Sequence, residues 1–152
     1  MLKISLDVDD MSKNNNPFDA SNQTLRYEKA SKIILESIMR NKPITEGGAN
    51  CPILVEGIKD ERALRALGFN GIIEKLNRGW PVERIVVYIT ETYGNCIVLM
   101  DWDRTGGRLQ KRLMDSMTSL DIKPSDECRR ALSKAMKPDT MCVEDWPSFI
   151  GG

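Results

Sequence analysis

Histidine is absent from all 152 residues of this chain. Because histidine is the one side chain whose ordinary pKa lies between about pH 5 and 8, its absence removes several classes of chemistry. Serine–histidine and cysteine–histidine hydrolases, histidine-ligated metal sites and histidine phosphotransfer are excluded. Acid–base catalysis would have to use a carboxylate, a lysine, a tyrosine, a cysteine or metal-bound water.

Long apolar runs and a net charge are missing as well. No run approaches the roughly 18 residues of a membrane span, and the acidic start MLKISLDVDD lacks the apolar stretch of a signal peptide. We therefore expect no membrane partner and a cytoplasmic location. The 22 basic and 22 acidic side chains cancel, which argues against a basic coat for non-specific nucleic-acid binding. Aromatic residues, at 6%, predict no stacking platform for bases.

The cysteines are few and show no metal-binding spacing. None of Cys51, Cys96, Cys128 and Cys142 forms a C-x-x-C pair, and three of them sit in or beside apolar runs. Buried free thiols are expected rather than a structural zinc site.

Hydrophobic residues make up 41% and charged residues 29%, which is typical of one globular domain at this length. Residues 1–24 are polar and are expected to form a flexible N-terminal arm, and residues 25–50 a helix and a linker. The main domain is expected over residues 51–150.

Within that domain, apolar runs alternate with helical patterns. Strands are expected at 52–56, 71–76, 96–100 and 140–143, and helices at 60–67, from Pro81 to Gly94, at 107–120, and from a cap at Ser125 to Met136. Alternation of this kind predicts an α/β fold with a mostly parallel, Rossmann-like sheet of about four strands and helices on both faces.

Acidic residues stand where two of these strands end. Glu56 ends the first strand, and Asp101 and Asp103 follow the most apolar one. Ligands bind at the carboxyl ends of parallel strands, so these three carboxylates are expected to converge and to hold Mg²⁺. The alternatives are that the Asp-x-Asp pair only caps a helix and that Glu56 only forms a salt bridge.

Basic residues follow the acidic pair and could contact phosphates of a nucleic acid. The alternative is a solvated helix face. Gly106 and Gly107 would let the backbone turn tightly and let a phosphate approach. Trp102 could stack on a base or fill space above the sheet. The candidate phosphate contacts are Lys59, Arg104, Arg108, Lys111 and Arg112.

Two other motifs compete for this stretch. An EF-hand loop is rejected because its twelfth position, which must be acidic, is Arg112. A haloacid-dehalogenase-like phosphatase would explain Asp101, Asp103 and Thr105 but leaves Glu56 unexplained. It stays open as an alternative.

The two acidic motifs together resemble a Toprim domain. V-E-G-x-x-D runs from Val55 to Asp60, and D-x-D-x-x-G from Asp101 to Gly106. That module occurs in topoisomerases, bacterial-type primases, old-family nucleases, recombination-repair proteins and the maturase of 5S ribosomal RNA. The resemblance covers residues 51–150 and is strongest to small stand-alone archaeal Toprim proteins, which are similar to the catalytic core of that maturase.

The resemblance implies a role for each matching position. Glu56 would be the general acid or base, and Asp101 and Asp103 would hold one or two Mg²⁺ ions, or Mn²⁺ in their place, with Glu56 sharing a metal. Gly57 would leave room for substrate. Asp60 matches a common acid that is more often a helix cap than a ligand, and Glu144 resembles an acid near the last strand of the maturase-like group.

These features predict a Mg²⁺-dependent enzyme that cleaves phosphodiesters in nucleic acid, with RNA processing favoured over DNA cleavage. Neither topoisomerase nor primase activity is expected. The alternative is a non-catalytic or partner-dependent Toprim module that binds metal and nucleic acid. It would show an exposed apolar face, for instance on the helix from Tyr27 to Ile38.

Overall fold

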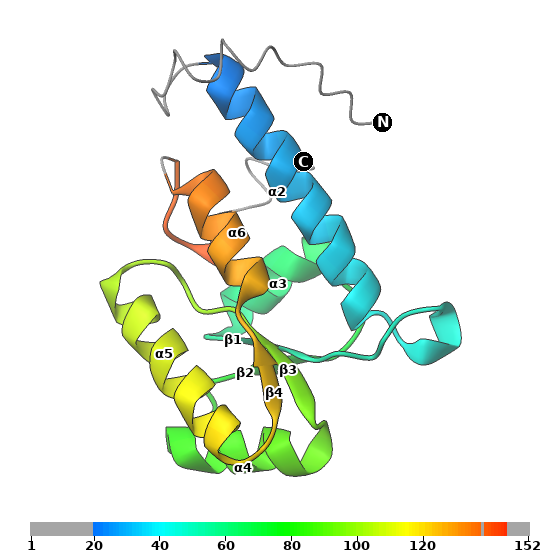
Figure 1. The fold of residues 1–152 in the computed structure, drawn as a ribbon, viewed down its shortest axis with the longest axis vertical. Coiled ribbons are helices and arrows are strands. Elements are labelled where there is room, and N and C mark those ends of the chain that lie inside the picture. The colour runs from blue at the N-terminus through cyan, green and yellow to red at the C-terminus, as the bar shows by residue number, and fades with distance from the viewer. Residues whose placement is uncertain (1–19, 138, 146–152) are drawn as a thin grey trace.

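The protein is an α/β structure built on one sheet of four parallel strands, in the order β2-β1-β3-β4 (Figure 1). The computed structural model describes residues 20–137 and 139–145. The strands are β1 (Ile53–Val55), β2 (Ile73–Lys75), β3 (Asn95–Val98) and β4 (Lys123–Ser125). The expected fold class and parallel sheet are confirmed. Within the described ranges, no helix is long and apolar enough to cross a membrane.

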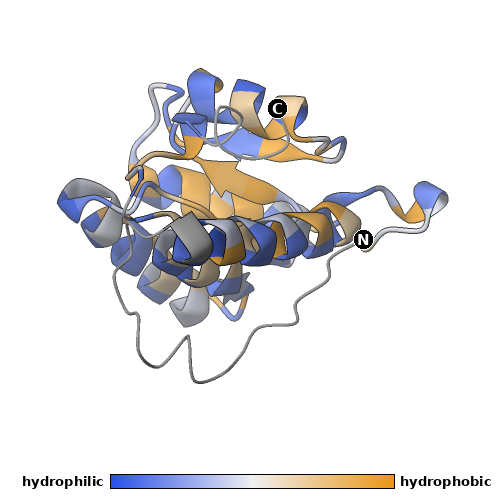
Figure 2. Ribbon diagram, turned by 90° about the horizontal axis from the view of Figure 1, so that it is seen from above, coloured by the Kyte–Doolittle hydropathy of each residue, from blue (hydrophilic) through white to orange (hydrophobic). Residues whose placement is uncertain are grey.

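Five α-helices and two short 3-10 helices surround the sheet in the described part of the chain. They are α2 (Ala20–Asn41), α3 (Ile58–Ala66), α4 (Val82–Thr92), α5 (Arg104–Ser119), α6 (Glu127–Met136), η1 (Ile44–Glu46) and η2 (Val143–Asp145). Figure 2 shows the apolar strands lying between layers of helices.

The sheet is apolar on both faces because successive side chains of a strand point to opposite sides. Ile53, Val55 and Ile97 pack on one side against residues of α2, α3 and α6. Leu54 and Val98 pack on the other against residues of α4 and α5. Cys51, Cys96 and Cys128 are buried free thiols, as expected, while Cys142 is only partly buried.

Two helix boundaries and one strand differ from expectation. Helix α2 begins at Ala20, so residues 20–24 belong to a helix and not to an arm; residues 1–19 and 146–150 lie outside the described part of the chain. Ser125 does not cap α6, because the N-cap of that helix is Asp126; Ser125 is instead the last residue of β4, a strand the sequence did not indicate. β4 carries Lys123 and Pro124 in place of an apolar pattern, and proline is tolerated there because β4 is an edge strand.

The strand expected at 140–143 is wrong. Instead, this segment leads into η2, and its backbone carbonyls and amides bond to residues 101 and 102. Its apolar character comes from Val143, which is fully buried in the core beside α2, α3 and α6.

Asn41 ties the end of α2 to the sheet. Its amide nitrogen donates to the carbonyls of Cys51 and Ile72, both at 2.9 Å, and its oxygen accepts from the amide of Gly71, also at 2.9 Å. The side chain is almost completely buried. This one residue therefore satisfies three backbone groups at the start of β1 and β2.

We expect Asn41→Ala to lower the free energy of unfolding by about 2–4 kcal/mol, because three buried backbone groups lose their partner. Urea denaturation measures this directly. The matched control is Asn70→Ala, whose side chain makes an exposed hydrogen bond to Glu46 at 3.0 Å and should change stability by less than about 0.5 kcal/mol. Equal effects of the two substitutions would contradict the role given to Asn41.

Candidate functional site

Glu56 and Asp101 meet at the carboxyl edge of the sheet. Strands β1 and β3 pair in parallel with Leu54 opposite Val98, and the pairing continues as the amide of Leu99 donates to the carbonyl of Leu54 at 2.9 Å. Beyond it, the amide of Asp101 donates to the Glu56 carboxylate at 3.3 Å. The sequence prediction that these two acids share one edge is therefore confirmed in position.

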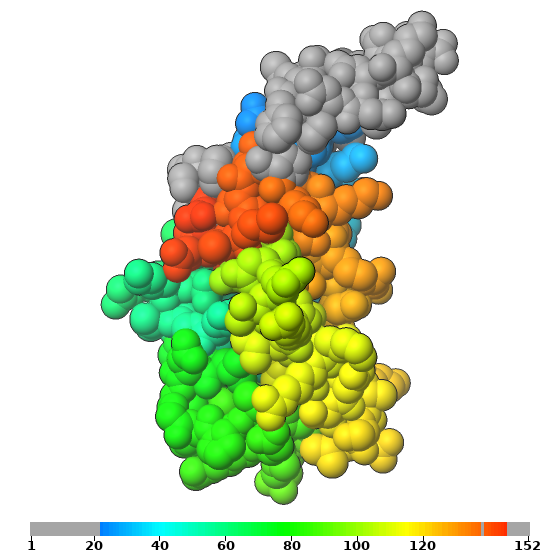
Figure 3. Space-filling model, turned by 90° about the vertical axis from the view of Figure 1, so that its left-hand side faces the viewer, coloured from blue at the N-terminus to red at the C-terminus, as the bar shows by residue number. Residues whose placement is uncertain are grey.

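Figure 3 looks onto this edge. The segments around residues 60, 80, 100 and 140 adjoin one another on that face. They are the chain that follows β1, β2 and β3, together with the segment that ends in η2. The site is thus built from four stretches far apart in the sequence.

The surroundings of Glu56 and Asp101 disfavour the charged form of both carboxyl groups. Burial raises the pKa of Asp101 to about 6, and the nearby acids Asp60, Glu56 and Asp103 add to the effect, while the Val143 amide, 2.8 Å from Asp101 Oδ1, opposes it. Burial also raises the pKa of Glu56, with Asp60 and Asp103 adding to it. Two desolvated carboxylates side by side are costly unless a proton or a cation joins them.

Asp103 and Asp60 serve as helix caps. Asp103 is exposed and precedes α5, and its Oδ1 accepts from the amide of Gly106 at 2.7 Å. Asp60 is buried in the first turn of α3, where its Oδ2 accepts from the amide of Gly57 at 2.9 Å. Burial raises the pKa of Asp60, and Glu144 adds to it, so Glu144 lies close to the site although it is exposed.

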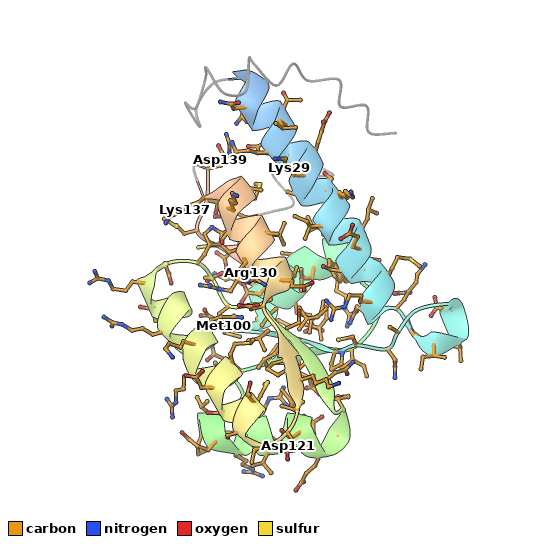
Figure 4. All side chains as sticks on the ribbon, viewed as in Figure 1. Lys29, Met100, Asp121, Arg130, Lys137 and Asp139 are labelled. Atoms are coloured by element: carbon orange, nitrogen blue, oxygen red, sulfur yellow. The ribbon has the colours of Figure 1, made fainter. Side chains whose placement is uncertain are left out.

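Arg129 is a charged residue at this edge that the sequence did not indicate. It projects from the first turn of α6, and its guanidinium donates from Nε to the carbonyl of Met100 at 3.1 Å and from Nη2 to that of Asp101 at 2.8 Å. Met100 follows β3 (Figure 4), and its amide donates to the Gln110 side chain of α5 at 3.1 Å. The positive charge opposes the rise in the pKa of Glu56. A cation in the first turn of a helix is unfavourable to the helix dipole, which is the one weak signal the sequence offered.

Trp102 fills space and does not face solvent. It is 7% exposed, its amide donates to the carbonyl of Met141 at 3.0 Å, and its indole Nε1 donates to that of Thr140 at 2.6 Å. Trp102, between the two aspartates, therefore points into the protein and binds the segment that leads into η2. Of the two roles considered for Trp102, stacking on a base is ruled out in this conformation.

The predicted phosphate contacts separate into two groups. Lys111 pairs with Asp115 on the same helix, and Arg112 pairs with Glu83 of α4. Arg104 and Arg108 are exposed near the start of α5, and among the described residues they make no ion pair. Lys59 is exposed and lines a shallow hollow between α3 and η2. Of these five side chains, Lys59, Arg104 and Arg108 can contact phosphate without first breaking an ion pair.

The two glycines of the Toprim-like motifs differ in what they allow. A Cβ at Gly57 would meet only the side-chain Nδ2 of Asn77, at an ordinary 3.6 Å, so there is room beside Glu56. A Cβ at Gly106 would lie 1.9 Å from the carbonyl oxygen of Asp101. Gly106 is therefore needed for the close approach of α5 to Asp101, and not for the approach of a phosphate.

The donor set suits a hard cation, although it does not form a complete cage. Glu56, Asp101 and Asp103 offer only oxygen ligands, which Mg²⁺ prefers. Within the described residues, no three acidic or cysteine side chains come together closely enough to hold a metal among themselves. Mg²⁺ usually keeps several waters and takes one or two carboxylates plus substrate phosphates, so the two desolvated carboxylates fit it in chemistry and number.

Comparison with known proteins finds relatives whose names state no activity. No protein-family model matches the chain. A UPF0292 protein of Thermococcus sibiricus is 38% identical over 96 residues, covering 63% of this chain and 75% of the relative. A UPF0292 protein of Pyrococcus furiosus is 34% identical over 119 residues, covering 78% and 82%. A solved structure of a putative protein from Aquifex aeolicus shares the fold, with a TM-score of 0.55 at 21% identity over 86% of this chain and 100% of that one.

Gly106→Ala and Gly107→Ala test how α5 approaches the site. We expect Gly106→Ala to cost at least about 1–3 kcal/mol, because its Cβ overlaps the Asp101 carbonyl. At Gly107 the nearest atom is Arg129 Nη2 at 3.7 Å, so alanine should be neutral or gain about 0.5–1 kcal/mol from helix propensity. Chemical denaturation of both variants measures the difference, and a tolerated Gly106→Ala would contradict the packing.

Asp101→Asn should stabilise the protein at neutral pH. The folded-state pKa of Asp101, about 6, exceeds its ordinary 3.8, so the folded protein holds this proton more tightly than the unfolded chain does. The charged form therefore costs stability above about pH 6, and the cost disappears as the pH falls toward 3.8. Asparagine removes the charge and can still accept from the Val143 amide.

The measurement is thermal unfolding from pH 4 to 8 in the presence of EDTA. The variant should melt at least about 2–4 °C above the wild type at pH 8 and together with it near pH 4. Asp115→Asn, an exposed aspartate on α5, is the control and should show no such gain. A variant less stable than the wild type at pH 8 would show that the charge of Asp101 is well accommodated without metal.

Proposed function

This chain belongs to the UPF0292 family, and we propose that it is a Mg²⁺-dependent Toprim-type enzyme that cleaves phosphodiester bonds in nucleic acid. The observation that carries the proposal is the contact between Glu56 and Asp101 across β1 and β3. Both carboxyl groups have raised pKa values there, and perturbed groups gathered at one edge of an α/β sheet are typical of functional sites.

Glu56 is the proton-transferring group. Its pKa is raised mainly by burial, which brings a glutamate toward the range where it both accepts and releases a proton near neutral pH. The room beside Gly57 lets a substrate oxygen reach it. Glu56 would then protonate the oxygen that leaves phosphorus or deprotonate the one that attacks it.

Asp101 would hold the metal together with Asp103 or Glu56, and water and substrate oxygens would complete its coordination, since no three carboxylates among the described residues meet closely enough to hold it alone. When bound, Mg²⁺ supplies neutralisation of charge on the non-bridging phosphate oxygens. The backbone amide of Val143 donates to the Asp101 carboxylate and orients it for this role. Arg129 of α6 donates to the backbone carbonyl of Asp101. Asp103 caps α5 through Oδ1, which leaves its second oxygen for a ligand.

Positive side chains around the edge suit a nucleic acid. Arg104 and Arg108 on α5 and Lys59 on α3 are exposed on the elements that follow Asp103 and Glu56. Such residues fix the register of a phosphate backbone without reading its sequence. The preference for RNA over DNA rests on the resemblance to the 5S ribosomal RNA maturase and is an analogy.

A partner-dependent module is the second candidate, favoured by one observation. Leu35 and Met39, four residues apart on α2, are 62% and 51% exposed. The apolar face predicted for that helix is not the exposed one, because Ile34 is buried and Tyr27 and Ile38 pack on the core. The exposed pair lies on another side of α2.

Glu56→Gln should lower the rate of cleavage about 10²- to 10⁴-fold while leaving substrate binding unchanged, because the amide can accept the Asp101 hydrogen bond but cannot transfer a proton. Asp101→Asn/Asp103→Asn should raise the Mg²⁺ concentration for half-maximal rate by more than about tenfold. The assay follows labelled structured RNA, single-stranded DNA and duplex DNA with Mg²⁺ or Mn²⁺. Asp115→Asn is the control and should keep wild-type activity.

Three results would argue against the proposal. Cleavage that survives both substitutions would place the chemistry elsewhere. Hydrolysis of small phosphate esters without cleavage of any nucleic acid would favour the phosphatase alternative. Inactivity of the purified chain that is relieved by a protein bound at Leu35 and Met39 would favour the partner-dependent module, and Leu35→Ser/Met39→Ser should abolish that relief.

A further inference from the structure

Trp80 lies against two arginines and an aromatic neighbour, in a group that the acidic site does not use. The guanidinium carbon of Arg84 is 4.1 Å from the centre of the Trp80 ring, and that of Arg78 is 5.3 Å from it. The ring of Tyr88 packs edge-on against Trp80 at 5.7 Å, and the ring of Tyr93 packs edge-on against Tyr88 at 6.2 Å. Three of the nine aromatic residues of the chain therefore meet here, although their small number predicted no stacking platform.

Glu74 of β2 binds three members of this aromatic and arginine group through its carboxylate. Its carboxylate accepts from Arg78 at 2.8 Å, from the Tyr88 hydroxyl at 2.8 Å, and from the Tyr93 hydroxyl. Arg78 also donates to the carbonyl of Lys75 at 2.6 Å. These contacts hold Arg78 in place and neutralise it, while Arg84 is exposed on α4 and held only against the ring. The ring of Trp80 is partly exposed.

The group begins where the acidic site ends. The backbone amide of Asn77 donates to the carbonyl of Glu56 at 2.9 Å, so the chain between β2 and α4 leaves the sheet beside Glu56. Three residues of extended chain, the separation of Asn77 and Trp80, span at most about 11 Å. In Figure 3 the segment around residue 80 adjoins the segment around residue 60 on the same face.

We infer that Trp80 and Arg84 form a stacking platform for an unpaired base of the nucleic-acid strand that the acidic site cleaves. Proteins hold splayed-out bases by stacking them on aromatic rings or on guanidinium planes, since both are planar and each base has a π-face. The N–H groups on the edge of Arg84 remain free to reach a phosphate. The inference rests on the proposed function and adds that the substrate is single-stranded next to the cleaved bond.

A purely structural role is the competing explanation. Trp80 also packs against the core on the α4 and α5 side, so its loss could act through stability alone. The two roles differ in what they predict for the bases of a ligand. Stacking depends on bases, whereas a loss of folding or of charge affects a strand with and without bases alike.

The experiment measures binding by fluorescence anisotropy in EDTA, which prevents cleavage. The probes are a labelled oligouridylate about 12 nucleotides long and a strand of the same length without bases. The variants are Trp80→Leu, which keeps apolar bulk, Trp80→Phe, which keeps an aromatic ring, and Arg84→Gln. Arg130→Gln on α6 is the control for loss of one exposed arginine. Thermal unfolding of each variant checks that it is folded.

We expect the wild type to bind the oligouridylate more tightly than the strand without bases. Trp80→Leu should weaken binding of the oligouridylate about 5- to 150-fold and change binding of the other strand less than about twofold. Trp80→Phe should retain most of the affinity, Arg84→Gln should lie between, and Arg130→Gln should match the wild type.

Equal weakening on both strands, or no weakening, would overturn the platform, as would a wild type that binds neither strand. Its failure is separable from that of the proposed function. A wild type that cleaves RNA while Trp80→Leu keeps the full preference for bases overturns only the platform. A wild type that binds bases through Trp80 but cleaves nothing with any metal overturns only the proposed chemistry.

Discussion

The burial of two carboxyl groups, Glu56 and Asp101, at one edge of the sheet is the constraint on which the rest of the structure depends. Parallel pairing of β1 with β3 leaves no freedom in where these two acids end up, and burial raises the pKa of both. Two neighbouring groups partly offset the cost of burying these charges. The Val143 amide donates to the Asp101 carboxylate, and the Arg129 guanidinium donates to the Asp101 carbonyl. Neither neutralises the pair fully. Two buried carboxyl groups whose charge is not fully neutralised by the surrounding residues are typical of a site that binds a cation or transfers a proton.

The segment from Thr140 to Val143 contributes to the site although it contains no proposed catalytic group. It is bound to the edge through the backbone and indole of Trp102 and through the Asp101 carboxylate. Arg26 of α2, paired with Asp139 at 2.8 Å beyond the end of α6, anchors the same segment from the other side (Figure 4). The orientation of Asp101 therefore depends on contacts that extend to α2.

The sequence could predict the acidic pair because both acids follow apolar strands, and a strand end is a local signal. It could also predict the buried cysteines, and it considered a helix cap as one of two roles for Asp60 and for Asp103. It could not predict Arg129, whose partners are backbone carbonyls that carry no residue identity, nor β4, which pairs as an edge strand without an apolar pattern. It misassigned Thr140–Val143 because an apolar residue buried by a turn looks the same in a sequence as one buried by a strand.

The two ends of the proposed site differ in how they use charge. At Glu56 and Asp101, like charges are placed together and desolvated, so binding energy is available to any cation that relieves them. At Trp80, the charge of Arg78 is already neutralised by Glu74, and the guanidinium of Arg84 lies over the aromatic ring. A small ion would gain little binding energy there. The first arrangement favours metal and phosphate and the second favours a flat, weakly polar surface. A nucleotide carries both a phosphate and a flat, weakly polar base. The two arrangements together therefore suit one nucleotide-binding face.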